Sequence, residues 1–421
     1  MRPECVCQSA NHCLSDDRIH AVASPSQPVP ASHRIDSIDI FRGITVLIMI
    51  FVDNLGFVQG LPWWTEHMPR EANGMTYVDM VFPAFLFLMG MSLPLDISSQ
   101  RARGAAKSKI WARVVLRSFI LVALGLFVAN APQVDAGNTG IASEWWVGLG
   151  FIGIGLVLSK FPARNRHPKI SAVLTYAGVA LFVVLAIIFR RVPLEGHVAW
   201  LDFSDWEILG LLGWAYLAVA TIYILFETKV AVLFSAFAAF VAVNAFSVAG
   251  KLSWLNLLPS CAKPFEAGLT SITMAGLLAT LLIVRNEIAP TSRSKVAWAM
   301  TSAAILFAAG WLLRPLGISK IRDTPTWCLY CIAANLLIVL LLYWIADIKH
   351  WSGWASVTGP VGRNPLLSYF LPYVAYLSPK LDWLTADGTA GWAGVAKSLF
   401  FAGMIWGAVA LLDRTRIGLR V

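Results

Sequence analysis

Residues 34–43 read R-I-D-S-I-D-I-F-R-G, and residues 73–90 read N-G-M-T-Y-V-D-M-V-F-P-A-F-L-F-L-M-G. Between them lie an apolar run that ends at Val52 and a polar loop that holds His67. Ionisable groups this close to two apolar segments are costly in a membrane and mark functional sites. We therefore expect residues 34–100 to organise the fold and to hold the active site.

The composition is that of a membrane protein. Of the 421 residues, 57% are apolar and only 14% are charged, whereas soluble domains carry about 25% charged residues. Apolar runs of about 20 residues recur along the chain, and each is long enough to cross a bilayer as a helix. We predict an all-α, polytopic transmembrane bundle of about 10 to 12 helices. The predicted spans are Ile40–Phe57, Tyr77–Leu93, Val114–Ala131, Trp145–Leu158, Ile170–Phe189, Ile208–Phe226, Val230–Val248, Ala267–Val284, Val296–Leu313, Trp327–Tyr343, Val357–Leu377 and Trp392–Leu412.

Lysine and arginine are unevenly distributed over the predicted loops. If the N-terminus is cytoplasmic, the loops on its side hold about twice as many of these residues as the opposite loops, which agrees with the positive-inside rule. We predict an integral protein of the bacterial inner membrane with both termini in the cytoplasm. The formal net charge of +9 then reflects topology, and we expect no binding to nucleic acid.

The N-terminal region differs from the rest of the chain. Residues 1–33 are polar and rich in proline and serine, so they cannot bury a core, and we predict a disordered cytoplasmic tail. The cysteines and the histidine of this tail would suit zinc, but an unstructured tail explains them better. We predict no metal site, and we assign residues 34–421 to one transmembrane domain.

Several polar residues within residues 34–100 are candidate catalytic residues. Asp53 and Asn54 follow the first apolar run. They either line a pocket between helices or are solvated at the end of the span, and we favour the pocket. His67 is either a surface residue or a catalytic base or nucleophile, because histidine titrates near neutral pH. Asp79 begins the next apolar run in capping-box form, while Pro83 leaves a nearby carbonyl free. A cap and a site role both stay open for Asp79.

A second group of candidates is basic. Arg42 follows Asp39 by three residues, so it can pair with that carboxylate on one helix face or bind a phosphate bidentately; both interpretations stay open. Residues 358–369 read T-G-P-V-G-R-N-P-L-L-S-Y. Their free backbone amides, together with Arg363 and Asn364, would suit a phosphate, although a simple turn explains the segment equally well.

Several of these segments resemble the heparan-alpha-glucosaminide N-acetyltransferase family and its bacterial membrane relatives. The resemblance is carried by S-I-D-I-F-R-G at 37–43, His67, G-M-T at 74–76, D-M-V-F-P at 79–83, F-L-F-L-M-G at 85–90 and G-R-N-P-L-L at 362–367. Weaker similarity covers 266–273 and 319–327, which include Glu266 and Lys320. Taken alone, those two residues indicate only solvated loop charges.

Members of that family move an acetyl group from cytosolic acetyl-CoA to the amine of a terminal glucosamine on the far side of the membrane. The resemblance thus implies that residues 34–421 are a transmembrane acyltransferase domain with acetyl-CoA as acyl donor and an amino sugar or glycan as acceptor. It assigns His67 to catalysis, with Asn54 beside it, and Glu266 and Lys320 to the acceptor. From the residue types themselves, Asp53 or Asp79 would take part in catalysis by orienting the ring of His67, and Arg42, Arg363 and Asn364 would hold the phosphates of acetyl-CoA. Asp53 stands where the family's asparagine is expected.

Two other functions agree with the same layout. One is a secondary transporter for sugars or amino sugars, because about 12 spans with both termini inside is a common transporter layout. The other is an O-acetyltransferase that acts on a hydroxyl of an envelope glycan. The glycine- and alanine-rich spans permit close helix contacts, so a homodimer is compatible with this sequence.

Overall fold

The computed structural model describes residues 36–160, 168–192, 196–227, 229–252, 267–283, 291–376, 383, 385–415 and 418–419. Contacts divide the chain into two units, Met1–Arg34 and Ile35–Val421, and every described element belongs to the second. The predicted tail, residues 1–33, and the predicted acceptor residue Glu266 lie outside the described residues.

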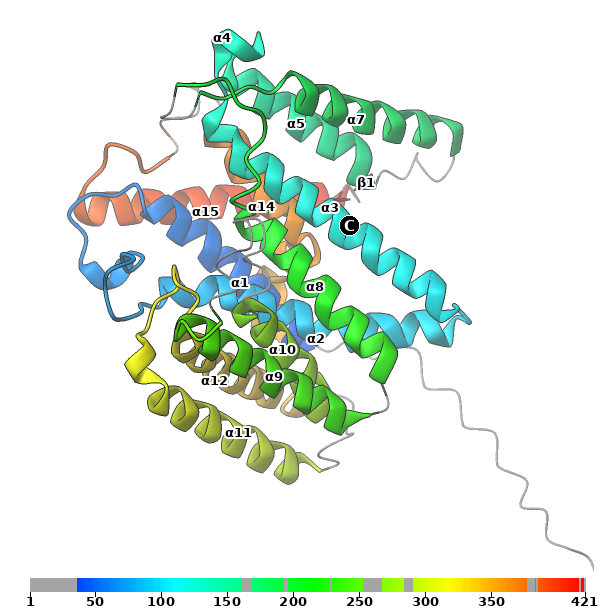
Figure 1. The fold of residues 1–421 in the computed structure, drawn as a ribbon, viewed down its shortest axis with the longest axis vertical. Helices are drawn as coiled ribbons and strands as arrows, with labels where there is room; N and C mark the ends of the chain where they lie inside the picture. Colours follow the sequence, from blue (N-terminus) through cyan, green and yellow to red (C-terminus); the bar gives the residue numbers. More distant parts are fainter. Residues whose placement is uncertain are drawn as a thin grey trace, which may run out of the picture. The chain divides into compact units, whose positions relative to one another are not determined.

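Helices dominate the described part of the chain (Figure 1). The longer ones are α1 (Asp36–Leu55), α2 (Val81–Ala102), α3 (Lys107–Asn130), α5 (Ser143–Leu158), α7 (Pro168–Ile188), α8 (Glu207–Phe226), α9 (Val230–Val248), α10 (Gly268–Ile283), α11 (Ser292–Leu312), α12 (Pro325–Leu342), α14 (Pro365–Tyr376) and α15 (Gly391–Arg414). Shorter turns include η1 (Trp63–Thr65), η2 (Val78–Met80), α4 (Ala136–Thr139), the π-helix η7 (Tyr343–Ile348), η8 (Gly353–Val357) and α13 (Gly359–Arg363). Strand β1 (Ser159–Lys160) pairs antiparallel with β2 (Gly418–Leu419).

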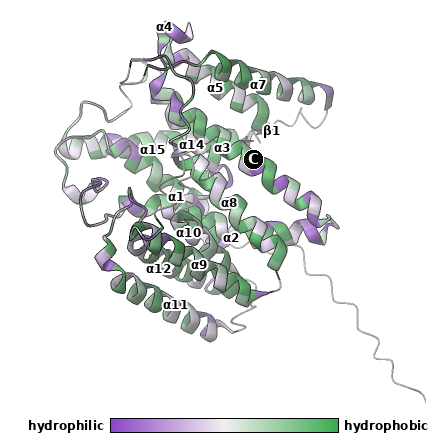
Figure 2. Cartoon of the chain, viewed as in Figure 1, coloured by the Kyte–Doolittle hydropathy of each residue, from purple (hydrophilic) through white to green (hydrophobic). Residues whose placement is uncertain are grey.

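Within the described residues, eight helices are long and apolar enough to cross a membrane. Apolar residues cover most of their length, and hydrophilic residues gather at the helix ends and in the loops (Figure 2). The predicted fourth and eighth spans are shorter helices, α5 and α10, of 16 residues each. The predicted first span is α1, whose 20 residues include Asp39, Arg42 and Asp53. The chain is thus an all-α integral membrane protein.

The predicted span Val357–Leu377 is wrong as a continuous helix. It is divided into η8, α13 and α14, and Asn364 between the last two has φ −126° and ψ 55°, outside the helical region. The reason is Pro365, whose ring disfavours the helical conformation of the residue before it and which has no N–H to donate.

Helix α10 lies at the centre of the packing. All of its residues except Leu269 are buried, and it packs against α2, α8, α9 and α12. Figure 1 shows three further pairs running side by side, α3 with α8, α11 with α12, and α5 with α7. Among the described residues, α10 is therefore enclosed by other helices along nearly its whole surface.

Glycines permit the closest helix approaches. A Cβ added at Gly90 of α2 would lie 1.9 Å from the carbonyl oxygen of Thr273, and one added at Gly276 of α10 would lie 1.9 Å from that of Phe87. The two backbones are therefore in direct contact, as small residues allow in membrane helices.

Replacing Gly276 with alanine is expected to lower the free energy of unfolding by about 1–3 kcal/mol, because the added methyl group forces the backbones of α2 and α10 apart. Thermal unfolding in detergent measures the loss. Gly403→Ala is the matched control, since it places a methyl group on α15 where no atom lies within 4 Å and alanine favours helix over glycine. Equal melting temperatures for the two variants would contradict this packing.

The start of α1 is held against the other helices. The side chain of Asp347, in η7, accepts hydrogen bonds from the backbone N–H groups of Asp36 (3.1 Å) and Ser37 (3.2 Å). A Cβ at Gly43 would lie 2.4 Å from the carbonyl oxygen of Thr358, so α1 packs directly on the segment that holds α13. This contact brings Arg42 and Arg363 to the same end of the helices.

Candidate active site

His67 and Asp79 form the centre of the site. Nδ1 of His67 lies 2.7 Å from Oδ1 of Asp79. The Asp79 side chain is 1% exposed and that of His67 is 48% exposed, so a buried carboxylate orients an accessible imidazole. With Nδ1 donating to the carboxylate, Nε2 keeps its lone pair for a proton. Sequence reasoning predicted both residues, and the structure brings them together.

The second oxygen of Asp79 holds the loop in place. Oδ2 accepts from the backbone N–H groups of Thr76 (3.1 Å) and Met68 (3.4 Å). The hydroxyl of Thr76 donates to the carbonyl of Glu66 (2.9 Å). One oxygen of Asp79 therefore accepts from the backbone, as the cap prediction requires, while the other lies against His67.

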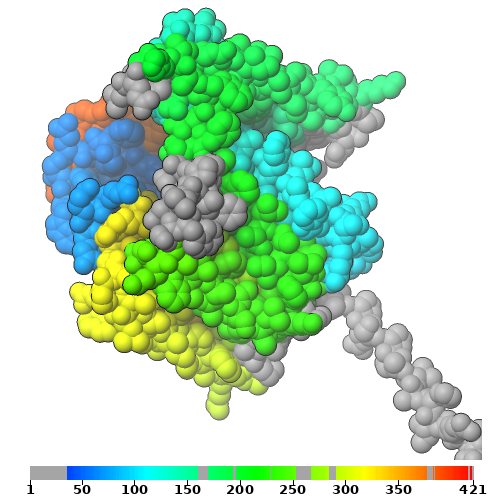
Figure 3. Space-filling model, viewed as in Figure 1, coloured from blue at the N-terminus to red at the C-terminus, as the bar shows by residue number. Residues whose placement is uncertain are grey.

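Lys320 reaches the same histidine from a distant part of the chain. Its Nζ lies 3.3 Å from Nε2 and 3.4 Å from Nδ1 of His67. The two loops are joined by backbone contacts, since the N–H of Gly74 donates to the carbonyl of Ile318 (3.0 Å) and the N–H of Ile318 donates to Oδ1 of Asn73 (2.8 Å). In Figure 3 the blue and yellow surfaces of these loops lie side by side.

Burial lowers the pKa of Lys320 below its ordinary value of 10.5, although Asp79 and Asp53 partly oppose this effect. The residue as a whole is half-buried. Lys320 is therefore more than the solvated loop charge that the residue pattern indicated.

Asp53 faces this group from the end of α1. It interacts electrostatically with His67 and Lys320, and its side chain is exposed. Among the described residues it forms no hydrogen bond or ion pair.

Asn54 points elsewhere. Its side chain is fully buried, and Oδ1 accepts from the N–H of Ala386 and from the hydroxyl of Ser398, both at 3.1 Å. Nδ2 lies 3.4 Å from the hydroxyl of Tyr376. The contact with Ser398 fastens the end of α1 to α15, because Ser398 belongs to that helix.

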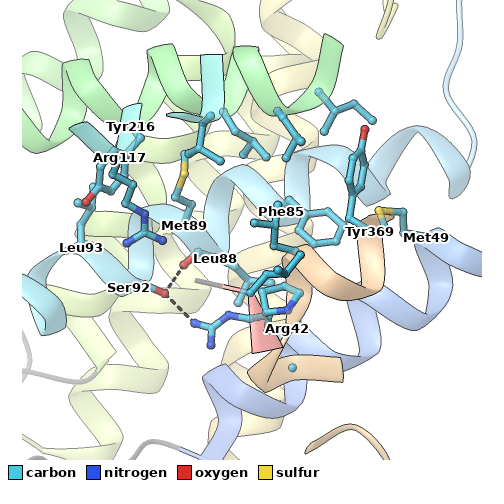
Figure 4. A pocket seen from close by; sticks show the side chains of 18 of the residues that line it. Arg42, Met49, Phe85, Leu88, Met89, Ser92, Leu93, Arg117, Tyr216 and Tyr369 are labelled. Carbon is cyan, nitrogen blue, oxygen red and sulfur yellow. Dashed lines mark hydrogen bonds between the residues drawn. The ribbon is translucent and has the colours of Figure 1, made fainter. Parts of the chain in front are cut away.

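A cavity of about 360 Å³ opens at the other end of α1. Its lining includes three arginines, Arg42, Arg117 and Arg363, and its apolar part contains Met49, Phe85 and Tyr369 (Figure 4). Arg42 donates to Oδ1 of Asp39 (3.1 Å) and to the hydroxyl of Ser92 (2.8 Å). The predicted ion pair with Asp39 is confirmed, and the guanidinium still reaches the cavity wall.

The other predicted donor-site residues are joined to α15. Arg363 forms an ion pair with Asp413, and Nδ2 of Asn364 donates to the same carboxylate (2.9 Å). Sequence reasoning missed Arg117, whose Nε is buried without a hydrogen-bond partner among the described residues and whose guanidinium lies 5.0 Å from the ring centre of Tyr216. An arginine inside an apolar span was the signal that could have revealed it.

The two ends are chemically different. One carries an accessible imidazole oriented by a carboxylate, with a lysine beside it, which suits proton transfer and stabilisation of a developing negative charge. The other carries arginines around an apolar cavity, which suits an anion with an apolar arm. Among the described residues no group of three or more His, Cys, Asp or Glu side chains could hold a metal ion.

Fold and site together define an all-α integral membrane protein with a histidine–carboxylate centre at one end of its helices. Residues 34–258 match the model of a family described as a domain of unknown function (DUF5009). The chain is 38% identical over 168 residues to human heparan-alpha-glucosaminide N-acetyltransferase, which covers 39% of the chain and 21% of that protein. It is 35% identical over 114 residues to the mouse protein, which covers 27% of the chain and 17% of that protein.

The chain belongs to this family of membrane proteins, since the DUF5009 model spans more than half of it, and the two partial matches confirm the resemblance to the heparan-alpha-glucosaminide N-acetyltransferase family. These matches cover less than a quarter of the length of either relative.

Proposed function

We propose that this protein is a membrane acetyltransferase that uses acetyl-CoA as donor and the amine of a glucosamine-type amino sugar as acceptor. The observation that carries the proposal is the accessible His67 held by the buried Asp79 at 2.7 Å, at the opposite end of α1 from an arginine-lined cavity. The names of both relatives favour this reaction. The cavity end would face the cytosol and the His67 end the far side of the membrane.

The cavity fits the donor in its chemistry. Arg42, Arg363 and the buried, unpartnered Nε of Arg117 would hold the phosphates, as arginine forks do. The apolar side of the cavity, which includes Met49, Phe85 and Tyr369, would contact the pantetheine arm. Along α1, Arg42 and Asp53 are about 16 Å apart at 1.5 Å per residue, so an extended arm is needed to bring the acetyl group toward His67.

The amine nitrogen of the acceptor attacks the carbonyl carbon of the thioester in acetyl-CoA. Nε2 of His67 takes the proton that the amine nitrogen loses as its bond to the acetyl carbon forms and the carbon–sulfur bond breaks, and it returns that proton to the thiolate. Asp79 keeps the ring oriented and stabilises its charged form. Lys320, 3.3 Å from Nε2, would stabilise the negative charge on the carbonyl oxygen.

Transfer of radiolabelled acetyl from acetyl-CoA by detergent-purified protein tests the proposal, with glucosamine and glucose as acceptors. We expect labelled N-acetylglucosamine and no labelled glucose. Transfer to glucose alone would establish an O-acetyltransferase instead. Absence of both acetyl-CoA binding and transfer, combined with sugar uptake into proteoliposomes, would establish a transporter.

Replacing Arg42 with glutamine is expected to raise the KM for acetyl-CoA about 10-fold, because one charge-assisted bond to a phosphate is lost. The kcat is expected to stay within about threefold of wild type, since His67 is not affected. Arg103→Gln is the control, because Arg103 is an exposed arginine at the same end of the helices. An equal effect of both substitutions on KM would mean that surface charge, and not the cavity, binds the donor.

The alkaline limb of the pH–rate profile is expected to lie below pH 10.5, because Lys320 acts as a charged donor and its pKa is lowered by burial. The rate is full while Lys320 is protonated and falls as the pH rises through this lowered pKa. Lys320→Arg is expected to reduce the rate but to abolish this limb, because guanidinium stays charged. Lys251→Arg, at an exposed lysine, is the control; a limb that persists in Lys320→Arg would remove Lys320 from the mechanism.

A further inference from the structure

Tyr369 brings a polar group to the apolar part of the cavity. This residue of α14 lines the cavity together with Met49, Phe85 and Leu209. Figure 4 shows Tyr369 and Arg117 on opposite sides of the cavity. Small-molecule sites are mostly apolar, and the few polar groups in them fix the orientation of the ligand. The hydroxyl of Tyr369 is therefore placed to orient a molecule that enters the cavity.

The hydrogen bonds of this hydroxyl determine which partner it can take. Oε2 of Glu207 lies 2.7 Å from the Tyr369 hydroxyl and 3.3 Å from the backbone nitrogen of Leu209. A backbone N–H can only donate, so Oε2 acts as an acceptor, and the Tyr369 hydroxyl donates its single proton to it. The Tyr373 hydroxyl, 3.2 Å from that of Tyr369, then donates to Tyr369.

One lone pair of the Tyr369 oxygen is left over. A hydroxyl has one proton and two lone pairs. The proton goes to Glu207, and one lone pair accepts from Tyr373. Within the part of the chain that the structure describes, no other group bonds this oxygen. The Tyr369 oxygen can therefore accept one further hydrogen bond, but it has no proton to give to a ligand.

Glu207, which fixes this arrangement, has a strained backbone. Its φ is +51°, in the left-handed region that residues other than glycine avoid, and Oδ1 of Asp205 accepts from its N–H (3.0 Å). Strain of this kind persists only where the surrounding structure imposes it, and it concentrates at functional sites. Capping of α8 accounts for the bond to Leu209 but not for the bond to Tyr369.

A ligand that donates an N–H fits this acceptor. An N–H that stays unpaired in an apolar cavity costs the desolvation of that group, so an arm with amide groups needs an acceptor there. The pantetheine arm of coenzyme A carries secondary amides. A lipid tail has no donor for the Tyr369 oxygen, and the carbonyl of an ester or a thioester finds no proton on it.

We propose that the Tyr369 oxygen accepts the N–H of a pantetheine amide, and that Glu207 is the positioning residue that keeps the Tyr369 proton turned away from the ligand. The cavity thereby selects a donor with an amide-bearing arm over one with a hydrocarbon arm. This inference rests on the proposed use of acetyl-CoA and adds selection of the arm to binding of the phosphates. It is measurable as binding, without acetyl transfer.

The test is calorimetric binding of coenzyme A and of its nucleotide part, which keeps the phosphates and lacks the pantetheine arm. Detergent-purified wild type is compared with Tyr369→Phe, Glu207→Gly and Glu207→Gln. Phenylalanine keeps the ring and removes the hydroxyl. Glycine removes the carboxylate and relieves the positive φ, whereas glutamine keeps an acceptor oxygen for Tyr369. Tyr330→Phe is the control, because Tyr330 is a half-buried tyrosine of α12 that does not line the cavity.

We expect Tyr369→Phe to raise the Kd of coenzyme A about 10-fold, as for an N–H left unpaired, and to leave the Kd of the nucleotide part unchanged. Glu207→Gly is expected to raise the Kd of coenzyme A about threefold, because the freed Tyr369 proton can turn toward the ligand. Glu207→Gln and Tyr330→Phe are expected to bind both ligands as wild type does. Rescue by glutamine separates positioning of Tyr369 from a general structural role of the side chain.

Two results would overturn the inference while the proposed function stands. One is an unchanged affinity of Tyr369→Phe for coenzyme A. The other is an equal loss of affinity for coenzyme A and for its nucleotide part, which would assign Tyr369 to the phosphates or to the shape of the cavity. If wild type binds coenzyme A in a Tyr369-dependent way but transfers no acetyl group, the proposed function fails and the amide site remains. If wild type binds neither ligand, both fail.

Discussion

Replacing His67 with alanine is expected to lower the kcat of acetyl transfer by about 10²- to 10⁴-fold, the usual contribution of a general base. The reason is local. The side chain of His67 is accessible, whereas the carboxylate of Asp79 that orients its ring is buried, so Asp79 cannot take over the role of base. A 10³-fold loss corresponds to about 4 kcal/mol of transition-state stabilisation.

The same substitution is expected to leave acetyl-CoA binding intact, because the arginine-lined cavity lies at the other end of α1. Equilibrium binding of acetyl-CoA to the purified variant measures this. His197→Ala, at an exposed histidine in the loop before α8, is the control and keeps full activity. A His67→Ala protein that transfers acetyl at the wild-type rate would exclude His67 as the base.

Replacing Asp79 with asparagine is expected to lower kcat by about 10²- to 10⁴-fold as well, for a different reason. The amide can present an N–H to Nδ1 of His67, which favours the imidazole tautomer with its proton on Nε2. That tautomer has no lone pair where the amine proton must go. The loss therefore appears in kcat, while the KM for acetyl-CoA is expected to stay near wild type.

Asp135→Asn is the matched control for this variant. Asp135 also accepts a backbone N–H at a helix start, from Asn138 at 2.7 Å, but it caps α4 and has no contact with His67. Comparable circular dichroism and melting temperature for the two variants would show that the fold is retained. Full activity of Asp79→Asn in a folded protein would mean that the tautomer of His67 does not matter, and it would contradict the proposed role of Asp79.

Sequence reasoning identified the residues whose signal is local. The pattern of Thr76 and Asp79 indicated a cap, and Oδ2 of Asp79 accepts from the N–H of Thr76 (3.1 Å). The spacing of Asp39 and Arg42 indicated an ion pair, which the structure confirms at 3.1 Å. Both depend on neighbours within one helical turn, so spacing alone contains the information.

The errors and omissions have physical reasons. The span Val357–Leu377 was predicted as one helix although a turn was considered for residues 358–369, and Pro365 was the signal that places the break at Asn364. The partners of Asn54 could not be predicted, because Ala386 and Ser398 lie more than 300 positions away along the chain.

The sequence by itself determined the class of protein and most of its helices. Apolar runs of about 20 residues must be helical in lipid because their backbone groups have no other partners. Only the tertiary structure decided which side chains meet. His67 and Lys320 are separated by 253 positions, and Glu207 reaches Tyr369 across 162 positions. Such encounters depend on how distant helices and loops pack together, and no local pattern encodes them.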